Sequence, residues 1–313
     1  MERPLRRSGV PAARPGRARP LGHARLFGVE AILGGAVTAG CWAVSTLSSS
    51  RSARRIGALS TLAWVMVVGL AVSVPIVAVG GVGQALTTDQ VVLLAIAGIS
   101  NVVGLLFGYT ALRLGKVAVV APIMSTEGAL GAVIAIAAGE PLAAASGVVL
   151  ALIALGVLLT ATEVPEWSPA ARNAEPVLVP AGLALAAAAC FGVNLYVSGR
   201  IGIELSVAWA VLPARVAGAV VVAVPLLLTG RATLTRQAVP FVVISGILEV
   251  AGIAAFALAA RGGIAVSSVV ASQFAAIAAV VSVLLFHERL ARHQLVGVTI
   301  IATGVAVLTA IQG

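Results

Sequence analysis

Long apolar runs, separated by short breaks of glycine, proline and charged residues, follow one another along nearly the whole chain. Each run has about 18–23 residues, the length that an α-helix needs to cross a bilayer core of about 30 Å. The runs predict ten membrane-spanning helices, near residues 29–47, 58–79, 91–112, 117–138, 145–162, 178–198, 206–228, 239–260, 265–286 and 294–311. We therefore expect an all-α polytopic membrane protein rather than a β-barrel, whose strands would be short and alternating.

Composition excludes the two main alternatives to a membrane protein. Hydrophobic residues make up 60% of the chain and charged residues only 10%, whereas a soluble domain carries about 25% charged residues. Such a chain cannot cover a folded surface with polar groups, and disorder requires low hydrophobicity. The two cysteines, Cys41 and Cys190, both stand in apolar runs and form neither a disulfide framework nor a metal-ligand pattern.

Basic residues are concentrated before the first apolar run, in a chain whose formal net charge is +9. The arginines of residues 1–28 predict a disordered tail or one that lies near anionic lipid headgroups, and we expect no nucleic-acid partner. A translation start further along, near Val10 or Val29, is an alternative.

The two halves of the sequence resemble each other, which is the most informative feature of the chain. A shift of 148 positions superposes Gly98 on Gly246, Gly104 on Gly252, Arg113 on Arg261 and Glu140 on Glu288. A shift of 149 superposes Cys41-Trp42 on Cys190-Phe191. We expect a repeat over 29–162, a linker over 163–177 and a second repeat over 178–313. Because each repeat has an odd number of spans, the second must enter the membrane from the opposite side, and substrates of such inverted repeats bind between the halves.

This layout resembles the EamA-type transporters of the drug/metabolite transporter superfamily. The turn Gly139–Leu142 after the fourth span and its copy His287–Leu290 after the ninth are similar to the family's Gly-Glu-Arg-Leu pattern, with Pro141 in place of arginine and His287 in place of glycine. Val120–Pro122 and Arg215 also resemble that family. The resemblance implies a multi-pass protein of a bacterial cell (inner or plasma) membrane that moves small metabolites, often amino acids or related solutes, and often by export.

Three ionisable residues stand inside predicted spans: Glu127, Arg215 and Glu249. A charge at the centre of a membrane helix costs about 2.5–3.5 kcal/mol on insertion scales, so each should face a cavity or a partner. One interpretation is a structural ion pair between Arg215 and one of the acids. The other is substrate or proton binding, since a poorly hydrated carboxylate can take up and release a proton near neutral pH.

Uncharged polar residues extend this candidate substrate and proton site, namely Asn101, Tyr109, Asn194, Tyr196 and Gln273. Asn101 is the repeat mate of Glu249, so both are expected to point toward the same central space. The alternative for each is a hydrogen bond between helices. Glu140 and Glu288 form a structural turn motif.

No catalytic triad, glycine-rich phosphate loop or metal cluster is found in the sequence, so we expect no enzyme, cofactor or metal. The interpretation that follows is a secondary transporter of a small polar metabolite, coupled to a gradient such as that of protons. A non-transporting membrane scaffold and a lipid-active membrane enzyme are the alternatives. The expected partners are a small-molecule substrate and the bilayer, and a homodimer is left open.

Membrane orientation is contested by two sets of charges. Most loop arginines follow odd-numbered spans, which places those loops in the cytoplasm and both termini outside. The arginine-rich tail and the family resemblance favour cytoplasmic termini. The sequence leaves orientation, substrate, direction, coupling ion and oligomeric state open.

Overall fold

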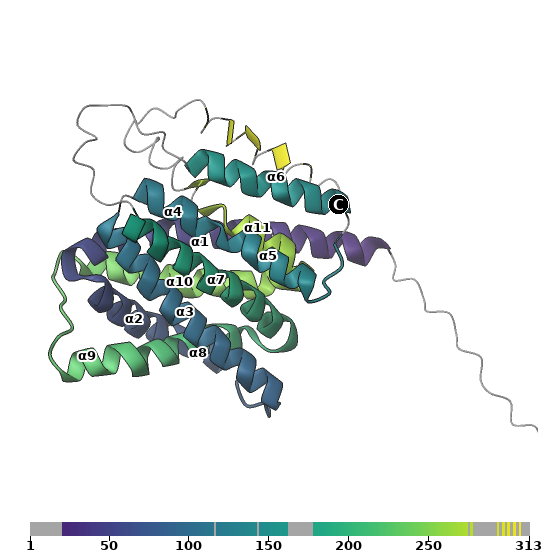
Figure 1. Ribbon diagram of the computed structural model, residues 1–313. Helices are drawn as coiled ribbons and strands as arrows, with labels where there is room; N and C mark the ends of the chain where they lie inside the picture. Colours follow the sequence, from purple (N-terminus) through teal and green to yellow (C-terminus); the bar gives the residue numbers. More distant parts are fainter. Residues whose placement is uncertain are drawn as a thin grey trace, which may run out of the picture.

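The computed structural model describes residues 21–115, 117–142, 144–161, 178–274 and 276–277, together with isolated positions between 293 and 307. Within these ranges the chain is helical and contains no strand (Figure 1). The elements are α1 (Leu21–Ile56), α2 (Ala58–Gly80), α3 (Thr88–Leu114), α4 (Val117–Ser125), α5 (Glu127–Ala137), α6 (Ala144–Ala161), α7 (Leu178–Glu204), α8 (Val207–Gly218), the π-helical η2 (Ala219–Ala223), α9 (Val224–Leu228), α10 (Val239–Ala259), the 3-10 helix η3 (Ala260–Gly262) and α11 (Ile264–Ala271).

Six helical segments of the described chain are long and apolar enough to cross a membrane: Val29–Ile56, Ala58–Gly80, Thr88–Leu114, Leu178–Glu204, Val207–Leu228 and Val239–Gly262. They correspond to the first, second, third, sixth, seventh and eighth predicted spans. The fourth and fifth contain shorter apolar helices, Ile123–Ala137 and Ala144–Gly156. Most of the ninth and tenth spans, the linker 163–177 and residues 1–20 lie outside the described residues.

Helices from the two halves of the chain pack against each other in matching pairs. The most extensive contacts join α1 to α10 and α3 to α7, and α2 packs on α8. In Figure 1, α6 lies at one edge of the bundle and α9 at the opposite edge. Since α1 and α7 are repeat mates, as are α3 and α10, the two main interfaces are equivalent in the two repeats.

Glycines allow these helices to approach closely. A Cβ on Gly98 of α3 would lie 3.3 Å from the carbonyl oxygen of Pro213 in α8. A Cβ on its repeat mate, Gly246 of α10, would lie 2.7 Å from Cγ1 of Val68 in α2. The Gly98–Gly246 match found in the sequence therefore marks a helix contact that recurs in both halves.

Side-chain hydrogen bonds connect neighbouring loops and helix ends at both ends of the bundle. At one end, Trp64 Nε1 donates to the Thr233 carbonyl at 3.1 Å, which ties the start of α2 to the loop before α10. At the other end, the hydroxyl of Ser206 donates to the Gly81 carbonyl at 3.0 Å, which ties the α7–α8 turn to the loop after α2. Helix α2 runs from the first end to the second and is about 35 Å long at 1.5 Å per residue.

The fourth predicted span is helical on both sides of its centre and contains a one-residue turn there. Helix α4 ends at Ser125, and α5 begins at Glu127 after a turn at Thr126. The Thr126 hydroxyl donates to the Ile123 carbonyl at 2.8 Å, a local bond that competes with the helical pattern. In the second half, α11 likewise ends at Ala271 before a turn at Ser272 and Gln273.

Candidate functional site

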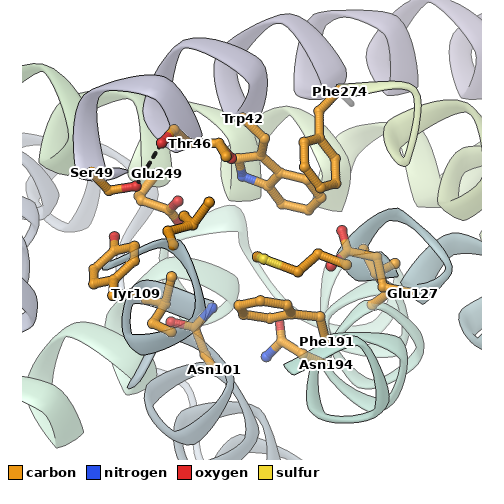
Figure 2. A pocket seen from close by; sticks show the side chains of 14 residues that line it. Trp42, Thr46, Ser49, Asn101, Tyr109, Glu127, Phe191, Asn194, Glu249 and Phe274 are labelled. Carbon is orange, nitrogen blue, oxygen red and sulfur yellow. Dashed lines mark hydrogen bonds between the residues drawn. The ribbon is translucent and has the colours of Figure 1, made fainter. Parts of the chain in front are cut away.

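A cavity of about 40 Å³ lies between the two halves (Figure 2). Its walls come from α1, α3, α4, α5, α7 and α10 and from Phe274 beyond α11. A space of about 10–15 Å³ on this measure holds one water, so the cavity has room for only a few waters. The polar residues that line it are Thr46, Ser49, Asn101, Tyr109, Glu127, Asn194 and Glu249.

Glu249 of α10 is held by partners on two other helices. The Ser45 hydroxyl of α1 donates to its Oε1 at 2.9 Å, and Nη2 of Arg215 in α8 lies 3.8 Å from its Oε2. The Arg215 side chain is fully buried and lies behind Glu249, since it is not among the residues that line the cavity. A Cβ on Gly69 of α2 would lie 2.8 Å from Cδ of Arg215, so this glycine leaves room for the arginine.

Arg215 itself is sparsely bonded. Its Nη1 faces the sulfur of Met66 at 3.7 Å, and its Nε and Nη2 have no hydrogen-bond partner among the described residues. The ion pair with Glu249 is therefore its main compensation for burial, because an unpaired buried charge is strongly unfavourable.

Glu127 has different surroundings at the first turn of α5. It is only 4% exposed and lines the cavity. Within the described part of the chain, the hydrogen bonds and salt bridges include none to its carboxylate. Figure 2 shows Glu127 and Glu249 on opposite sides of the cavity, with Trp42 and Phe191 between them.

Of the uncharged candidates, Asn101, Tyr109 and Asn194 line the cavity. Asn194 Nδ2 donates to the Ala97 carbonyl at 2.9 Å, which joins α7 to α3. Oδ1 of Asn101 and the hydroxyl of Tyr109 have no hydrogen-bond partner among the described residues. These two atoms are thus available to a bound polar solute.

Two other candidates do not line this cavity. Tyr196 packs as a partly buried residue beside two apolar clusters. Gln273 is buried in the turn after α11, where its Nε2 donates to the Val269 carbonyl at 3.0 Å. Tyr196 lies on a face of α7 other than the one that meets the cavity, and Gln273 lies in a turn beside it.

Glu140 lies in the turn after α5, outside the spans, and its carboxylate accepts the backbone N–H of Ala265 at 3.2 Å at the start of α11. Burial raises the pKa of Glu140, while backbone hydrogen bonds from Ala265 and Ile264 oppose that rise. An acid at this position stabilises a helix N-terminus and connects the two halves. Its repeat mate Glu288 lies outside the described residues.

The aromatic wall of the cavity was not among the sequence candidates. Trp42 of α1 and Phe191 of α7, which are repeat mates, both line the space. Each ring packs on a glycine of the opposite half: Trp42 on Gly252, and Phe191 on Gly104, whose Cβ would lie 2.7 Å from Cε1 of that ring. The sequence contained this signal, because both pairs matched between the repeats.

A helical bundle with polar and ionisable groups between its halves is an arrangement found in membrane transporters. Among the described residues, no group of three or more His, Cys, Asp or Glu side chains could hold a metal ion.

Comparison with known proteins agrees with this class. The model of the EamA-like transporter family matches residues 29–162. Residues 29–162 therefore form an EamA-like transporter unit of the drug/metabolite transporter superfamily, which confirms the family resemblance over the predicted first repeat.

Solved structures support the fold over most of the chain. One, described as "Crystal structure of protein", is similar with a TM-score of 0.68 and 19% sequence identity, over 93% of this chain and 97% of that chain. No curated protein sequence matches the chain.

Proposed function

We propose that this protein is a secondary active transporter that exports a small polar metabolite, such as an amino acid or related solute, through the cavity between its two halves. The observation that carries the proposal is the cavity between the two halves, with Glu127, Glu249 and Asn101 on its walls. Ionisable groups within membrane helices are costly and mark substrate or proton pathways. The EamA-like unit over residues 29–162 supports the same class of function.

The proposal includes two five-helix repeats inserted in opposite orientations. The α1–α2 turn and the α7–α8 turn are equivalent in the two repeats. The α1–α2 turn, at Gly57, precedes the first residue of α2, whereas Ser206 of the α7–α8 turn donates to the Gly81 carbonyl at the other end of α2. Two such halves can exchange conformations and open a shared cavity to either side of the membrane in turn.

Proton coupling is the energy source that fits the site. Glu249 has both a cation, Arg215, and a hydroxyl donor, Ser45, as partners. Protonation of Glu249 would weaken its attraction to Arg215, so proton uptake would change the contact between α10 and α8. These helices belong to the second half, and the linked movement would reopen the cavity.

Flux measurements on purified protein in liposomes test this function. Wild-type protein is expected to accelerate the exchange of a polar metabolite and to respond to an imposed proton gradient. Glu249→Gln, which removes the titrating group, should abolish the response to the gradient. Glu204→Gln is the matched control, because Glu204 forms an exposed pair with Arg200 on α7. Flux through Glu249→Gln with an unchanged gradient response would contradict the coupling role of this residue.

A further inference from the structure

The two carboxylates of the cavity are not balanced by an equal number of cations. The residues that line it include Glu127 and Glu249 but no lysine, arginine or histidine. Arg215 supplies one positive charge from behind Glu249. With both acids ionised, one negative charge remains, and it belongs to Glu127.

Glu127 is also the carboxylate with bonding capacity to spare. Its exposed fraction is only 4%. No described residue forms a hydrogen bond or a salt bridge with its carboxylate. An ionised carboxylate accepts several hydrogen bonds, and leaving these unmade in a buried site is unfavourable. A ligand that donates N–H groups and carries a positive charge would satisfy it.

Aromatic rings and a thioether surround the same space. Trp42, Phe191, Phe274 and Met124 line the cavity together with Glu127. Figure 2 shows the ring of Phe274 on the same side of the cavity as Glu127. The faces of aromatic rings attract cations, by about 0.5–2 kcal/mol each, and they also hold the apolar part of an amine. Among the described residues around the cavity, an anion would find only the fully buried Arg215, which already pairs with Glu249.

Three further atoms of lining residues have no hydrogen-bond partner among the described residues: Oδ1 of Asn101, the hydroxyl of Tyr109 and Nε1 of Trp42. The Nδ2 group of Asn194, a donor on the facing helix, is already engaged by the Ala97 carbonyl at 2.9 Å. Oδ1 of Asn101 can therefore accept an N–H of an ammonium group, while the Tyr109 hydroxyl and the Trp42 indole N–H can donate to an uncharged polar group of the same solute.

From this charge balance and these contacts we infer that the substrate is a small organic monocation, an alkyl or aryl ammonium compound whose charged nitrogen binds Glu127 between the aromatic rings. This inference rests on the proposed transport function and narrows its substrate class. Because the cavity of about 40 Å³ has room for only a few waters, the cation binds in a conformation in which the two halves have moved apart.

Two matched sets of solutes test the charge preference on the full chain in lipid nanodiscs. One set is tyramine, tyrosine and 3-(4-hydroxyphenyl)propionate, and the other is isoamylamine, leucine and 4-methylpentanoate. Within each set the side chain is constant and the charge changes from cation to zwitterion to anion. Equilibrium binding should be tightest for the amine in both sets. Binding of the carboxylate as tightly as the amine, or binding of neither amine, would overturn the inference.

Variants of Glu127 test its role in the same assay. Glu127→Gln should weaken amine binding by about 10- to 100-fold, the value of a hydrogen bond to a charged group, and Glu127→Asp should restore part of it. Glu204→Gln should bind amines as the wild type does. Unchanged amine affinity in a monodisperse Glu127→Gln protein would overturn the inference. If the Glu127→Gln protein fails to fold, the charge preference is decided by the solute series measured on the wild-type protein.

Flux of the same solutes into liposomes separates this inference from the proposed function. Amine binding without flux would support the cation site and contradict transport. Flux of the carboxylates but not of the amines would support transport and contradict the cation site.

Discussion

At the scale of single residues, the cavity contains two carboxylates, of which one is paired with a cation of the protein and the other is not. Glu249 is paired with Arg215 and bonded by Ser45, so its charge is compensated within the protein. Glu127 is buried beside aromatic rings without such a partner. We therefore assign Glu249 to the linkage between helices and Glu127 to the solute.

The Arg215–Glu249 pair gives a prediction about stability. Arg215→Leu leaves Glu249 buried without its cation, which should cost about 3–5 kcal/mol and lower the melting temperature of the purified protein. The double variant Arg215→Leu/Glu249→Leu removes both charges and should regain most of that loss while remaining inactive in flux assays. A double variant that melts below Arg215→Leu would contradict the view that the two charges stabilise each other.

The glycine that faces Trp42 gives a second prediction. In Gly252→Ala, the new methyl group would overlap the indole of Trp42, and overpacking of this kind costs about 1–3 kcal/mol. The variant should melt at a lower temperature and transport more slowly, because the wall of the cavity must shift. Gly40→Ala is the control, since a Cβ on Gly40 of α1 meets nothing within 4 Å. Equal losses in the two variants would show that the contact with Trp42 is unimportant.

The hydropathy of the sequence predicts the charged residues of the site but not its apolar residues. The high cost of a charge in a membrane helix singled out Glu127, Arg215 and Glu249, and the structure buries all three. Trp42 and Phe191 are as hydrophobic as residues that face lipid or the core, so hydropathy alone does not distinguish them. Tyr196 was selected for its polarity but does not line the cavity, because polarity does not reveal which face of a helix meets the cavity.

At the scale of helices, the crossing of α5 and α11 joins the two halves beside the cavity. Gly128 and Gly131 of α5 face Ser272 and Ser268, so closely that Gly128 has no room for a side chain. Both helices adjoin turns, at Thr126 and at Ser272–Gln273. Interrupted helices at the midplane are a common feature of transporters, and we expect this crossing to move when the cavity opens.

Crosslinking tests that expectation. A Cβ on Gly131 would lie 3.3 Å from Cβ of Ser268, close to the separation of about 3.5–4.5 Å found in disulfides. The pair Gly131→Cys and Ser268→Cys, in a background with Cys41 and Cys190 replaced by alanine, should form a disulfide on oxidation. Flux should stop on oxidation and return on reduction. Full flux through the oxidised, crosslinked protein would contradict movement at this crossing.

Apolar run length predicted most of the described helices, because hydrophobic segments of membrane length have few alternatives to a helix. Helix α1, which begins at Leu21 and ends at Ile56, extends beyond the predicted 29–47 at both ends. The turn at Thr126 was not predicted, since Thr and Ser carry no strong breaking signal within an apolar run. Helix α5, which follows this turn, packs against α11. A contact between such distant segments cannot be read from one apolar run.

At the scale of the whole molecule, charge is distributed unevenly between the two ends of the bundle. Six arginines of the described chain lie at the end where α1 meets α2, namely Arg51, Arg54, Arg55, Arg113, Arg231 and Arg236. Arg200 and Arg261 lie at the other end. The positive-inside rule predicts that the end with Arg54 and Arg55 faces the cytoplasm, against the orientation that the arginine-rich tail favours. An impermeant reagent applied to intact cells should therefore not reach this end.

The central claim, that two oppositely inserted halves enclose the cavity, is tested most directly by the sidedness of two equivalent loops. Gly83 lies in the exposed loop between α2 and α3, and Leu234, 42% exposed, lies in its counterpart between α9 and α10. Each is replaced by cysteine in turn, in the background without Cys41 and Cys190, and treated with a membrane-impermeant maleimide before and after permeabilisation. Oppositely inserted halves predict that one of the two is labelled in intact cells and the other only after permeabilisation. Labelling of both from the same side would contradict the account.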